Sequence, residues 1–255
     1  MAGFQATSIR KSYGGTLALE EVSLAVNEGE IHALLGENGA GKTTLLNILY
    51  GLLEPDSGEM LLDGKPYKPR SPREAKRAGV GMVHQHFMLA PTLEVGENIL
   101  LGENPFSLYQ GNRDFRAIRE RMDFLGFDFP LEARTDALSV GEMQRVEIFK
   151  ALWKGARLLA LDEPTAVLTP RECESLFELL RRIREQGHSV LFISHKLEEI
   201  EKVADRVSVL RRGRSVGCFP VAEASRAKLS RLMIGRDLCP PVKSSTRGGN
   251  SGSVV

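Results

Sequence analysis

Apolar and polar residues divide the first part of the chain into short strands separated by turns. Apolar or alternating runs predict strands at residues 7–9, 22–26, 31–35 and 59–62, the last of which ends at the turn Asp63-Gly64. After residue 35 comes the glycine-rich stretch GENGAGKTT. It opens a predicted helix from about Lys42 to Tyr50, with Gly51 placed as its C-terminal stop.

The pattern changes to a mostly helical one between about residues 87 and 154, where one amphipathic face carries Phe115, Ile118, Met122 and Leu125. Beyond residue 158, predicted strands at 158–161, 189–193 and 207–210 alternate with predicted helices at about 171–186 and 197–203. Alternation of this kind is typical of a parallel sheet with helices packed on it, so we predict an α/β fold.

Composition narrows the class of protein. The 255 residues suffice for one large domain or two modest ones, and the net charge of +1 gives no basic field that would favour nucleic acid. Cys173, Cys218 and Cys239 are widely spaced and odd in number, which favours a reducing cytosol over a disulfide framework or a zinc site. The chain has no signal-like N-terminus and no apolar run near the ~18–20 residues that span a bilayer, so any membrane role would come through a partner.

The glycine-rich stretch matches the phosphate-loop pattern G-x-x-x-x-G-K-[ST] in full. The matching residues are Gly36, Glu37, Asn38, Gly39, Ala40, Gly41, Lys42 and Thr43. In such a loop the backbone N–H groups surround the phosphates, the lysine reaches the β and γ phosphates, and the threonine hydroxyl binds Mg²⁺. A chance glycine turn is the alternative, but the position between an apolar strand and a helix strongly favours binding of ATP or GTP.

Two acids follow the predicted strand at 158–161, in the sequence RLLALDEPT. Ligands of open α/β sheets bind at the carboxyl ends of the strands, so Asp162 can hold Mg²⁺ while Glu163 polarises an attacking water. His195 follows the next apolar strand and is expected near these acids. Gln85 could ligate Mg²⁺ or orient water, and its neighbours His84 and His86 lack the further ligands that a transition-metal site would need.

LSVGEMQR, residues 138–145, contains a capping box in which Ser139 and Glu142 satisfy one another's backbone N–H groups at a helix start. Ser139 and Gly141 are also small residues at a helix N-terminus, which suits phosphate. Both interpretations stay open on these residues alone. Two interpretations also stay open for Tyr13, whose ring could stack on adenine or pack against neighbouring residues of the protein.

Taken together, these motifs resemble one family, the nucleotide-binding cassette of ABC transporters, over about residues 4–238. They stand in the family's order: aromatic loop at Tyr13, Walker A over residues 36–44 with Thr44, Gln loop at Gln85, signature at 138–142, Walker B at 158–163, D-loop at about 166–169 and His switch at His195. The resemblance implies a P-loop NTPase with a mostly parallel core sheet, an N-terminal antiparallel β subdomain and an inserted helical subdomain at about 87–154. This domain would span residues 1–238, with a Ser/Gly-rich disordered tail or linker at 239–255.

The resemblance also implies an ATPase that uses Mg²⁺ and works as a head-to-tail pair of cassettes. Lys42, Gln85, Glu163 and His195 would be catalytic, with Glu163 as general base and His195 as sensor of the γ-phosphate. Thr43, Gln85 and Asp162 would hold Mg²⁺, and Ser139 and Gly141 would contact ATP bound by the other cassette. The helical block would dock a membrane permease near HFMLAPTL, placing the protein at the cytoplasmic side of the membrane, with an extracytoplasmic solute-binding protein as an indirect partner and no nucleic acid.

GMVHQHFML, LSVGE and DEPTAVLTP are most similar to ATPase subunits of bacterial uptake systems for simple sugars and nucleosides, and the histidine-flanked Gln loop favours the nucleoside branch. Val140 and Glu142 depart from the common LSGGQ signature, and Thr169 stands where many members have Asp. These departures resemble the first cassette of proteins that carry two in one chain. The chain is therefore a half-protein that pairs with itself or another chain, or a shortened version of a longer one.

Two other functions compete with this one. A soluble ABC ATPase acting on nucleic acid or the ribosome would tend to carry coiled-coil, zinc or strongly basic insertions, whereas the block at 87–154 is compact and the net charge is nearly neutral. A regulatory cassette that binds ATP without turnover is disfavoured because both Glu163 and His195 are present. We therefore expect an ATP-hydrolysing subunit that drives import of a small solute.

Overall fold

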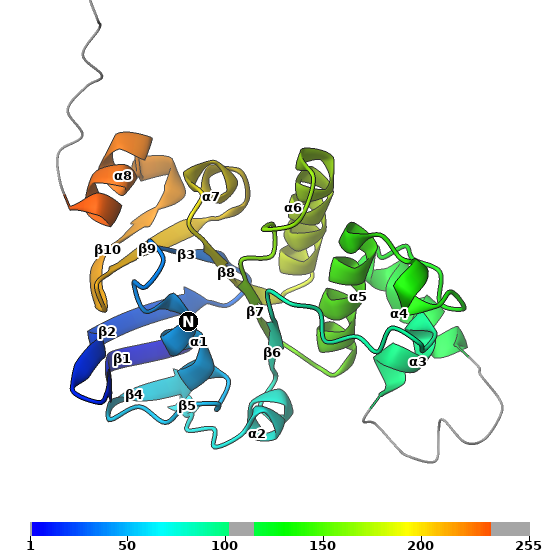
Figure 1. Ribbon diagram of the computed structural model, residues 1–255, viewed down its shortest axis with the longest axis horizontal. Coiled ribbons are helices and arrows are strands. Elements are labelled where there is room, and N and C mark those ends of the chain that lie inside the picture. The colour runs from blue at the N-terminus through cyan, green and yellow to red at the C-terminus, as the bar shows by residue number, and fades with distance from the viewer. Residues whose placement is uncertain (1, 102–114, 236–255) are drawn as a thin grey trace, which may run out of the picture.

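The computed structural model describes residues 2–101 and 115–235 (Figure 1). The tail or linker expected at 239–255 lies outside the described residues. Two sheets with helices around them form the described part of the chain.

The larger sheet has six strands in the order β10-β9-β3-β8-β7-β6. Its strands are β3 (Ile31–Leu35), β6 (Val80–Val83), β7 (Leu158–Asp162), β8 (Ser189–Ser194), β9 (Arg206–Arg211) and β10 (Arg214–Pro220). All neighbouring pairs are parallel except β9 and β10, which are antiparallel. The predicted mostly parallel sheet is thus confirmed, and the phosphate loop and both carboxylates follow or end strands at its carboxyl edge.

The smaller sheet is antiparallel, in the order β2-β1-β4-β5. It consists of β1 (Ala2–Tyr13), β2 (Thr16–Asn27), β4 (Ser57–Leu62) and β5 (Lys65–Pro66). The strands predicted at 7–9, 22–26 and 59–62 lie within it, and Asp63-Gly64 forms the turn between β4 and β5. It is the antiparallel unit expected at the N-terminus.

The helices fill the space around and between the sheets. They are α1 (Lys42–Leu49), α2 (Pro72–Arg77), α3 (Val95–Leu100), α4 (Arg116–Leu125), α5 (Val140–Trp153), α6 (Pro170–Glu185), α7 (Leu197–Val203) and α8 (Arg226–Ile234), with short 3-10 turns at Thr135–Ala137 and Val221–Glu223. In Figure 1, α6, α7 and α8 lie on one side of the six-stranded sheet, and α1 lies on the other side with the antiparallel sheet.

Alternate residues of β7, which lies between β8 and β6 in the six-stranded sheet, pack into different cores on its two faces, which keeps this strand covered on both sides. In β7, Leu158 and Ala160 belong to the core that contains α1 and the antiparallel sheet. Leu159 and Leu161 belong to the core that contains α3, α4, α5 and α6. The helix α1 is therefore enclosed between two sheets, and the loop before it is firmly anchored.

In the region predicted as mostly helical, residues 87–94 form no helix or strand, and its first helix is α3, which begins at Val95. Thr92 and Leu93 instead lie in turns just before a capping box of Glu94 and Glu97 that starts α3. The amphipathic helix is confirmed as α4, with Ile118, Met122 and Leu125 buried on its inner face.

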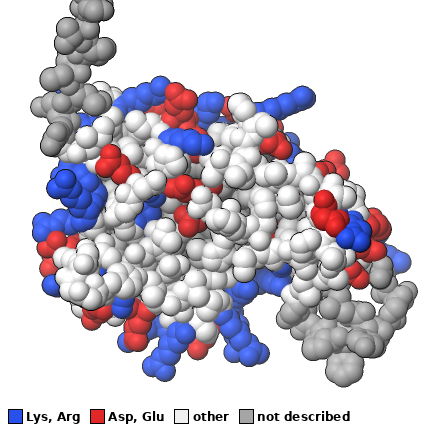
Figure 2. Space-filling view, in the orientation of Figure 1, with Lys and Arg blue, Asp and Glu red and all other residues white. Residues whose placement is uncertain are grey.

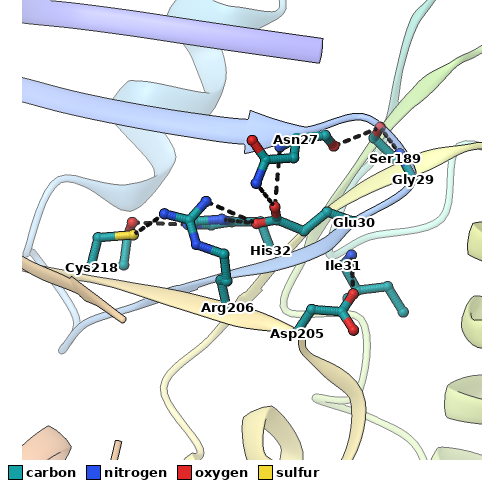
Figure 3. Close-up of polar contacts among 10 residues, drawn as sticks. Asn27, Gly29, Glu30, Ile31, His32, Ser189, Asp205, Arg206 and Cys218 are labelled. Atoms are coloured by element: carbon teal, nitrogen blue, oxygen red, sulfur yellow. Dashed lines mark hydrogen bonds and ion pairs between the residues drawn. The ribbon is translucent and has the colours of Figure 1, made fainter. Parts of the chain in front are cut away.

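A second polar cluster lies at the start of β3, at the end opposite the phosphate loop (Figure 3). His32 is fully buried, with Nδ1 2.5 Å from Oε1 of Glu30 and Nε2 2.8 Å from Oγ of Ser208. Glu30 also accepts from Asn27 and lies 3.5 Å from a guanidinium nitrogen of Arg206. The cluster ties β3 to β9 and to the end of β2, and it satisfies groups that would otherwise be costly to bury.

Candidate functional site

The phosphate loop requires its glycines. Gly41 begins α1 with φ of 106°, a value that L side chains rarely adopt. A Cβ at this position would lie 2.7 Å from Cδ2 of Leu19 and 2.9 Å from the carbonyl oxygen of Ala18. Gly39 also has a positive φ, 79°. A side chain at Gly41 would therefore push the loop away from β2.

Lys42 is buried, and its ammonium group is held inside the loop. Nζ donates to the carbonyl oxygens of Gly36 at 2.7 Å and Glu37 at 3.0 Å, and lies 3.9 Å from Oε1 of Glu163. Burial lowers the pKa of Lys42, and the nearby charges of Glu163 and Asp162 oppose that shift without cancelling it. A desolvated cation between carbonyls and carboxylates is well placed to attract an anionic ligand.

Asp162 and Glu163 end β7 and begin the following loop. Burial, and next the charge of Glu163, raise the pKa of Asp162, while Lys42 and His84 act in the opposite direction. Glu163 has φ of 47°, in the left-handed region, and its backbone N–H donates to the carbonyl oxygen of Ile193 in β8 at 3.1 Å. Strained backbone held by a neighbouring strand is typical of functional sites.

His195 lies where β8 ends, beside Glu163. Its Nδ1 is 3.1 Å from Oε1 of Glu163, and its side chain is 43% exposed against 18% for the glutamate. The histidine thus reaches the solvent side of the carboxylate. This is the proximity expected from two strands that end at the same edge of the sheet.

A cavity of about 710 Å³ opens over the phosphate loop, within the size range of small-molecule sites. It is lined by Thr16, Leu17, Ala18, Asn38, Gly39, Gly41, Lys42, Thr43, Thr44, Gln85, Asp162, Glu163, Arg212 and Gly213. Much of the phosphate loop, from Asn38 to Thr44, therefore shares one cavity with Gln85 and both carboxylates, whereas Gly36, Glu37 and Ala40 are not among the lining residues.

Some predicted residues lie apart from this cavity. Tyr13 ends β1, is 46% exposed and has Nζ of Lys11 6.0 Å from its ring centre, but it does not line the cavity. Ser139 and Gly141 do not line it either, because they lie at the start of α5. A ligand on this phosphate loop would therefore not be contacted by the same chain's Ser139 and Gly141.

The flanking histidines show no metal-site geometry. His84 packs edge-on against Tyr50, with ring centres 6.1 Å apart, and His86 is exposed. Across residues 2–101 and 115–235, no group of three or more His, Cys, Asp or Glu side chains is arranged to hold a metal ion. Carboxylate, hydroxyl and amide oxygens do line the cavity, which is the donor set that suits Mg²⁺ bound together with phosphates.

Similarity to known proteins agrees with this site. Residues 19–166, more than half of the chain, match the family described as ABC transporter. The chain belongs to the ABC transporter family. The chain is 45% identical to the glucose import ATP-binding protein TsgD13 of Haloferax volcanii and to the nucleoside import ATP-binding protein NupA of Lactococcus lactis. These alignments cover 91% and 92% of this chain but 48% and 47% of the relatives, so the chain spans about half the length of the curated relatives it matches.

The fold of this ABC domain matches solved cassettes closely. Its TM-score is 0.80 to the ADP conformation of MJ1267, an ATP-binding cassette of an ABC transporter. That comparison has 26% identity and covers 92% of this chain and 100% of the other. The predicted α/β P-loop NTPase fold is thus confirmed. None of the helices in the described part of the ABC domain combines the length and apolar character needed to cross a membrane.

Charge on the ABC domain is mixed. In the view of Figure 2, Lys and Arg gather along the edges, including the one below β5 and α2, while most of the middle is uncharged. This face therefore presents no continuous basic stripe of the kind that tracks nucleic acid.

The start of α5 in the ABC domain has the predicted capping box. Ser139 Oγ accepts from the N–H of Glu142 at 3.2 Å, and Oε2 of Glu142 accepts from the N–H of Ser139 at 2.8 Å. The carboxylate of Glu172, at the start of α6, lies beside Gly141, and the neighbouring Gly141 backbone contributes to lowering the pKa of that carboxyl after its hydrogen bonds with Thr169. A Cβ on Gly141 would lie 2.6 Å from Oε1 of Glu172, so a larger residue here would displace the Glu172 carboxylate.

Sequence reasoning missed Glu199, which lies behind the site. This buried carboxylate accepts from Thr165 Oγ1 at 2.7 Å and from Ser194 Oγ at 2.8 Å, and lies 2.9 Å from Nζ of Lys196. Thr165 lies two positions after Glu163, and Ser194 directly precedes His195. Glu199 therefore joins the two loops that carry these residues. Its position on the inner face of α7 gives the only sequence signal, a charged residue where an apolar one is expected.

Proposed function

We propose that the chain is the ATP-hydrolysing subunit of an ABC import system that powers uptake of a small solute through a separate membrane permease. One observation carries the proposal: a single cavity brings the phosphate-loop lysine Lys42 to the strand-end carboxylates Asp162 and Glu163, with His195 in contact with Glu163. This is the arrangement needed to bind a nucleoside triphosphate and to activate water beside it.

In this proposal the phosphate loop and Lys42 bind the β and γ phosphates of ATP. Thr43, Gln85 and Asp162 are the residues that would hold Mg²⁺, which when bound neutralises phosphate charge. Burial and the charge of Glu163 raise the pKa of Asp162, so a cation bound here would stabilise the charged carboxylate, which supports a cation-binding role beside the donor oxygens that line the cavity.

Hydrolysis then needs only one proton acceptor from the chain. Water attacks the γ-phosphorus, the bond from that phosphorus to the bridging oxygen of ADP breaks, and the proton of the water passes to a carboxylate oxygen of Glu163. His195 orients Glu163 through the 3.1 Å contact and lies on its solvent side, where the γ-phosphate would come close.

We further propose that two cassettes close on one another, with Ser139 and Gly141 of each facing ATP on the other. The separation of these residues from their own chain's cavity supports this arrangement. The partner is a second copy of the chain or another cassette. Either partner is consistent with relatives about twice as long as this chain, which have room for a second cassette.

A groove between α1, α2, β6 and α5 is where we place the permease. Its volume is about 400 Å³, and Met88 and Leu52, which are 67% and 48% exposed, lie on its rim. Met88 belongs to the stretch HFMLAPTL that follows Gln85. An apolar permease segment in this groove would lie close to a residue of the nucleotide site, which would link docking to hydrolysis.

The solute is proposed from the relatives that import glucose and nucleosides: a simple sugar or, with the histidine-flanked Gln loop, a nucleoside. The protein would then lie at the cytoplasmic side of the membrane, bound to the permease. A solute-binding protein outside the membrane would be an indirect partner.

Coexpression with the permease encoded next to it tests this function. We expect the chain to sediment with membranes only when the permease is present, and Met88→Glu to release it while leaving ATP binding in solution unchanged. A chain that stays in the supernatant alongside the permease, or ATPase activity that nucleic acid stimulates, would overturn the transport role.

A further inference from the structure

The turn between β9 and β10 carries an arginine into the wall of the nucleotide cavity. Arg212 and Gly213 are the central residues of this turn, with φ of 47° and 74°, and both line the cavity. The left-handed conformation suits Gly213, but for an arginine it costs stability. Asn or Gly would occupy the position of Arg212 with less strain.

The turn is fixed directly to the phosphate loop. The N–H of Gly213 donates to the carbonyl oxygen of Ala40 at 2.9 Å, and its carbonyl oxygen accepts from the N–H of Glu20 in β2 at 2.6 Å. A Cβ on Gly213 would lie 2.6 Å from the carbonyl oxygen of Ala18. The backbone of Arg212 therefore has a set position relative to both the loop and β2.

The guanidinium of Arg212 is free to meet an anion. The side chain is exposed, and within the described part of the chain no acidic group pairs with it. The contrast with Arg214, two positions further on, is informative: its Nε donates to Glu20 at 2.8 Å. Arg214 also does not line the cavity.

We propose that Arg212 is a nucleotide-binding residue that holds the α-phosphate end of ATP. The inference rests on the proposed ATP-binding function. Lys42 takes the β and γ phosphates, and the carboxylates lie beside it, so the γ end of the nucleotide points toward Glu163. Arg212 lies with Thr16 and Ala18 on the wall formed by the start of β2, just after Tyr13. Arg212 therefore contacts the α-phosphate end of the nucleotide, which ATP and ADP have in common.

Calorimetric titration of the whole chain with ATP and with ADP, both in EDTA, tests the proposal. We expect Arg212→Asn to weaken both nucleotides by the same factor, about five- to tenfold, because one charge-assisted contact is lost. Relief of strain should raise Tm by about 2–4 °C at the same time. Arg212→Lys keeps the charge and should recover most of the affinity, and Arg214→Asn should leave it unchanged.

The other possible results of these titrations would each contradict one part of the proposal. Unchanged affinity in Arg212→Asn would remove Arg212 from the site, and a loss confined to ATP would remove it from the α-phosphate. An equal loss of affinity in Arg214→Asn would show that the effect comes from the overall positive charge of the surface and not from a contact made by Arg212. If the unaltered chain and Lys42→Ala bind neither nucleotide, the proposed function itself fails, and this result is distinct from all the others.

Discussion

Oε1 of Glu163 and Nδ1 of His195 lie 3.1 Å apart, although the residues are 32 positions apart in the chain. Each follows a parallel strand, β7 or β8, and the pairing of Asp162 with Ile193 brings the strand ends level. The contact therefore depends on sheet register, and displacement of either strand by one residue would break it.

Replacement of Glu163 by Gln should abolish turnover but spare binding. The amide cannot accept the proton of the attacking water, so kcat should fall at least about 100-fold, while Lys42 and the loop still bind ATP. Single-turnover hydrolysis and calorimetry measure the two effects. Glu174→Gln, on the surface beside Lys202, is the matched control. Unchanged hydrolysis in Glu163→Gln would exclude Glu163 as the base.

Replacement of Ser139 by Arg should block hydrolysis that needs two cassettes. Ser225 is a matched control because it is also an exposed serine at a helix N-cap, accepting from the N–H of Lys228 at 3.3 Å. Either Ser→Arg change removes one cap and costs about 1 kcal/mol of unfolding free energy. ATPase activity should rise more steeply than protein concentration in the wild type and in Ser225→Arg, and should be lost in Ser139→Arg. Equal activity in the two variants would contradict the dimer.

Replacement of Glu199 by Ala should disturb both loops of the site. Thr165 and Ser194 lose their shared acceptor, so we expect a loss of about 2–3 kcal/mol in unfolding free energy and a lower kcat with little change in KM. Glu199→Gln keeps one acceptor oxygen and should recover part of kcat. Glu198→Ala is the control, since Glu198 is exposed and pairs with Arg226. A stability loss with normal kcat would make Glu199 purely structural.

Replacement of Glu30 by Gln should make stability less dependent on acid pH. Burial raises the pKa of Glu30, but the bond and charge of His32, with Arg206 and Asn27, outweigh it, so the folded pKa lies below 4.5. A lowered folded pKa adds stability that is present above pH 4.5 and is lost as pH falls through the folded value. In urea unfolding, the unfolding free energy of Glu30→Gln should be about 2–3 kcal/mol below that of the unaltered chain at pH 7. This difference should shrink below pH 4.5. Glu178→Gln, on the surface, should show no such pH-dependent deficit.

The sequence predicted the elements whose pattern is local. The strand at 31–35 and the helix at 197–203 match β3 and α7 residue for residue, and α6 differs from its predicted bounds by one residue at each end. The phosphate loop and the two acids at the end of β7 could also be predicted from local sequence, because phosphate and metal binding need particular residue types at a strand end.

Other elements depend on distant contacts, and their sequences hide them. The strand β6 contains Gly81, which weakens a strand pattern. A Cβ there would lie 2.8 Å from Cβ of Ala156 and 3.0 Å from that of Ala151, so glycine allows close approach of α5. Arg212 and Glu199 entered the site through tertiary folding alone, and no spacing along the chain connects either residue to Lys42.

The contact between Glu172 and Gly141 has a consequence for competition between anions. A helix N-terminus ordinarily attracts free anions. Here the carboxylate of Glu172, from the same chain, already lies beside Gly141, and the carboxylate of Glu142 accepts from the N–H of Ser139. Inorganic phosphate or sulfate would have to displace the Glu172 carboxylate, whose local concentration is high because it belongs to the same chain. In the proposed pair of cassettes, a nucleotide already held by the other cassette would be kept near this helix end by its remaining contacts, so the start of α5 would favour bound nucleotide over free phosphate.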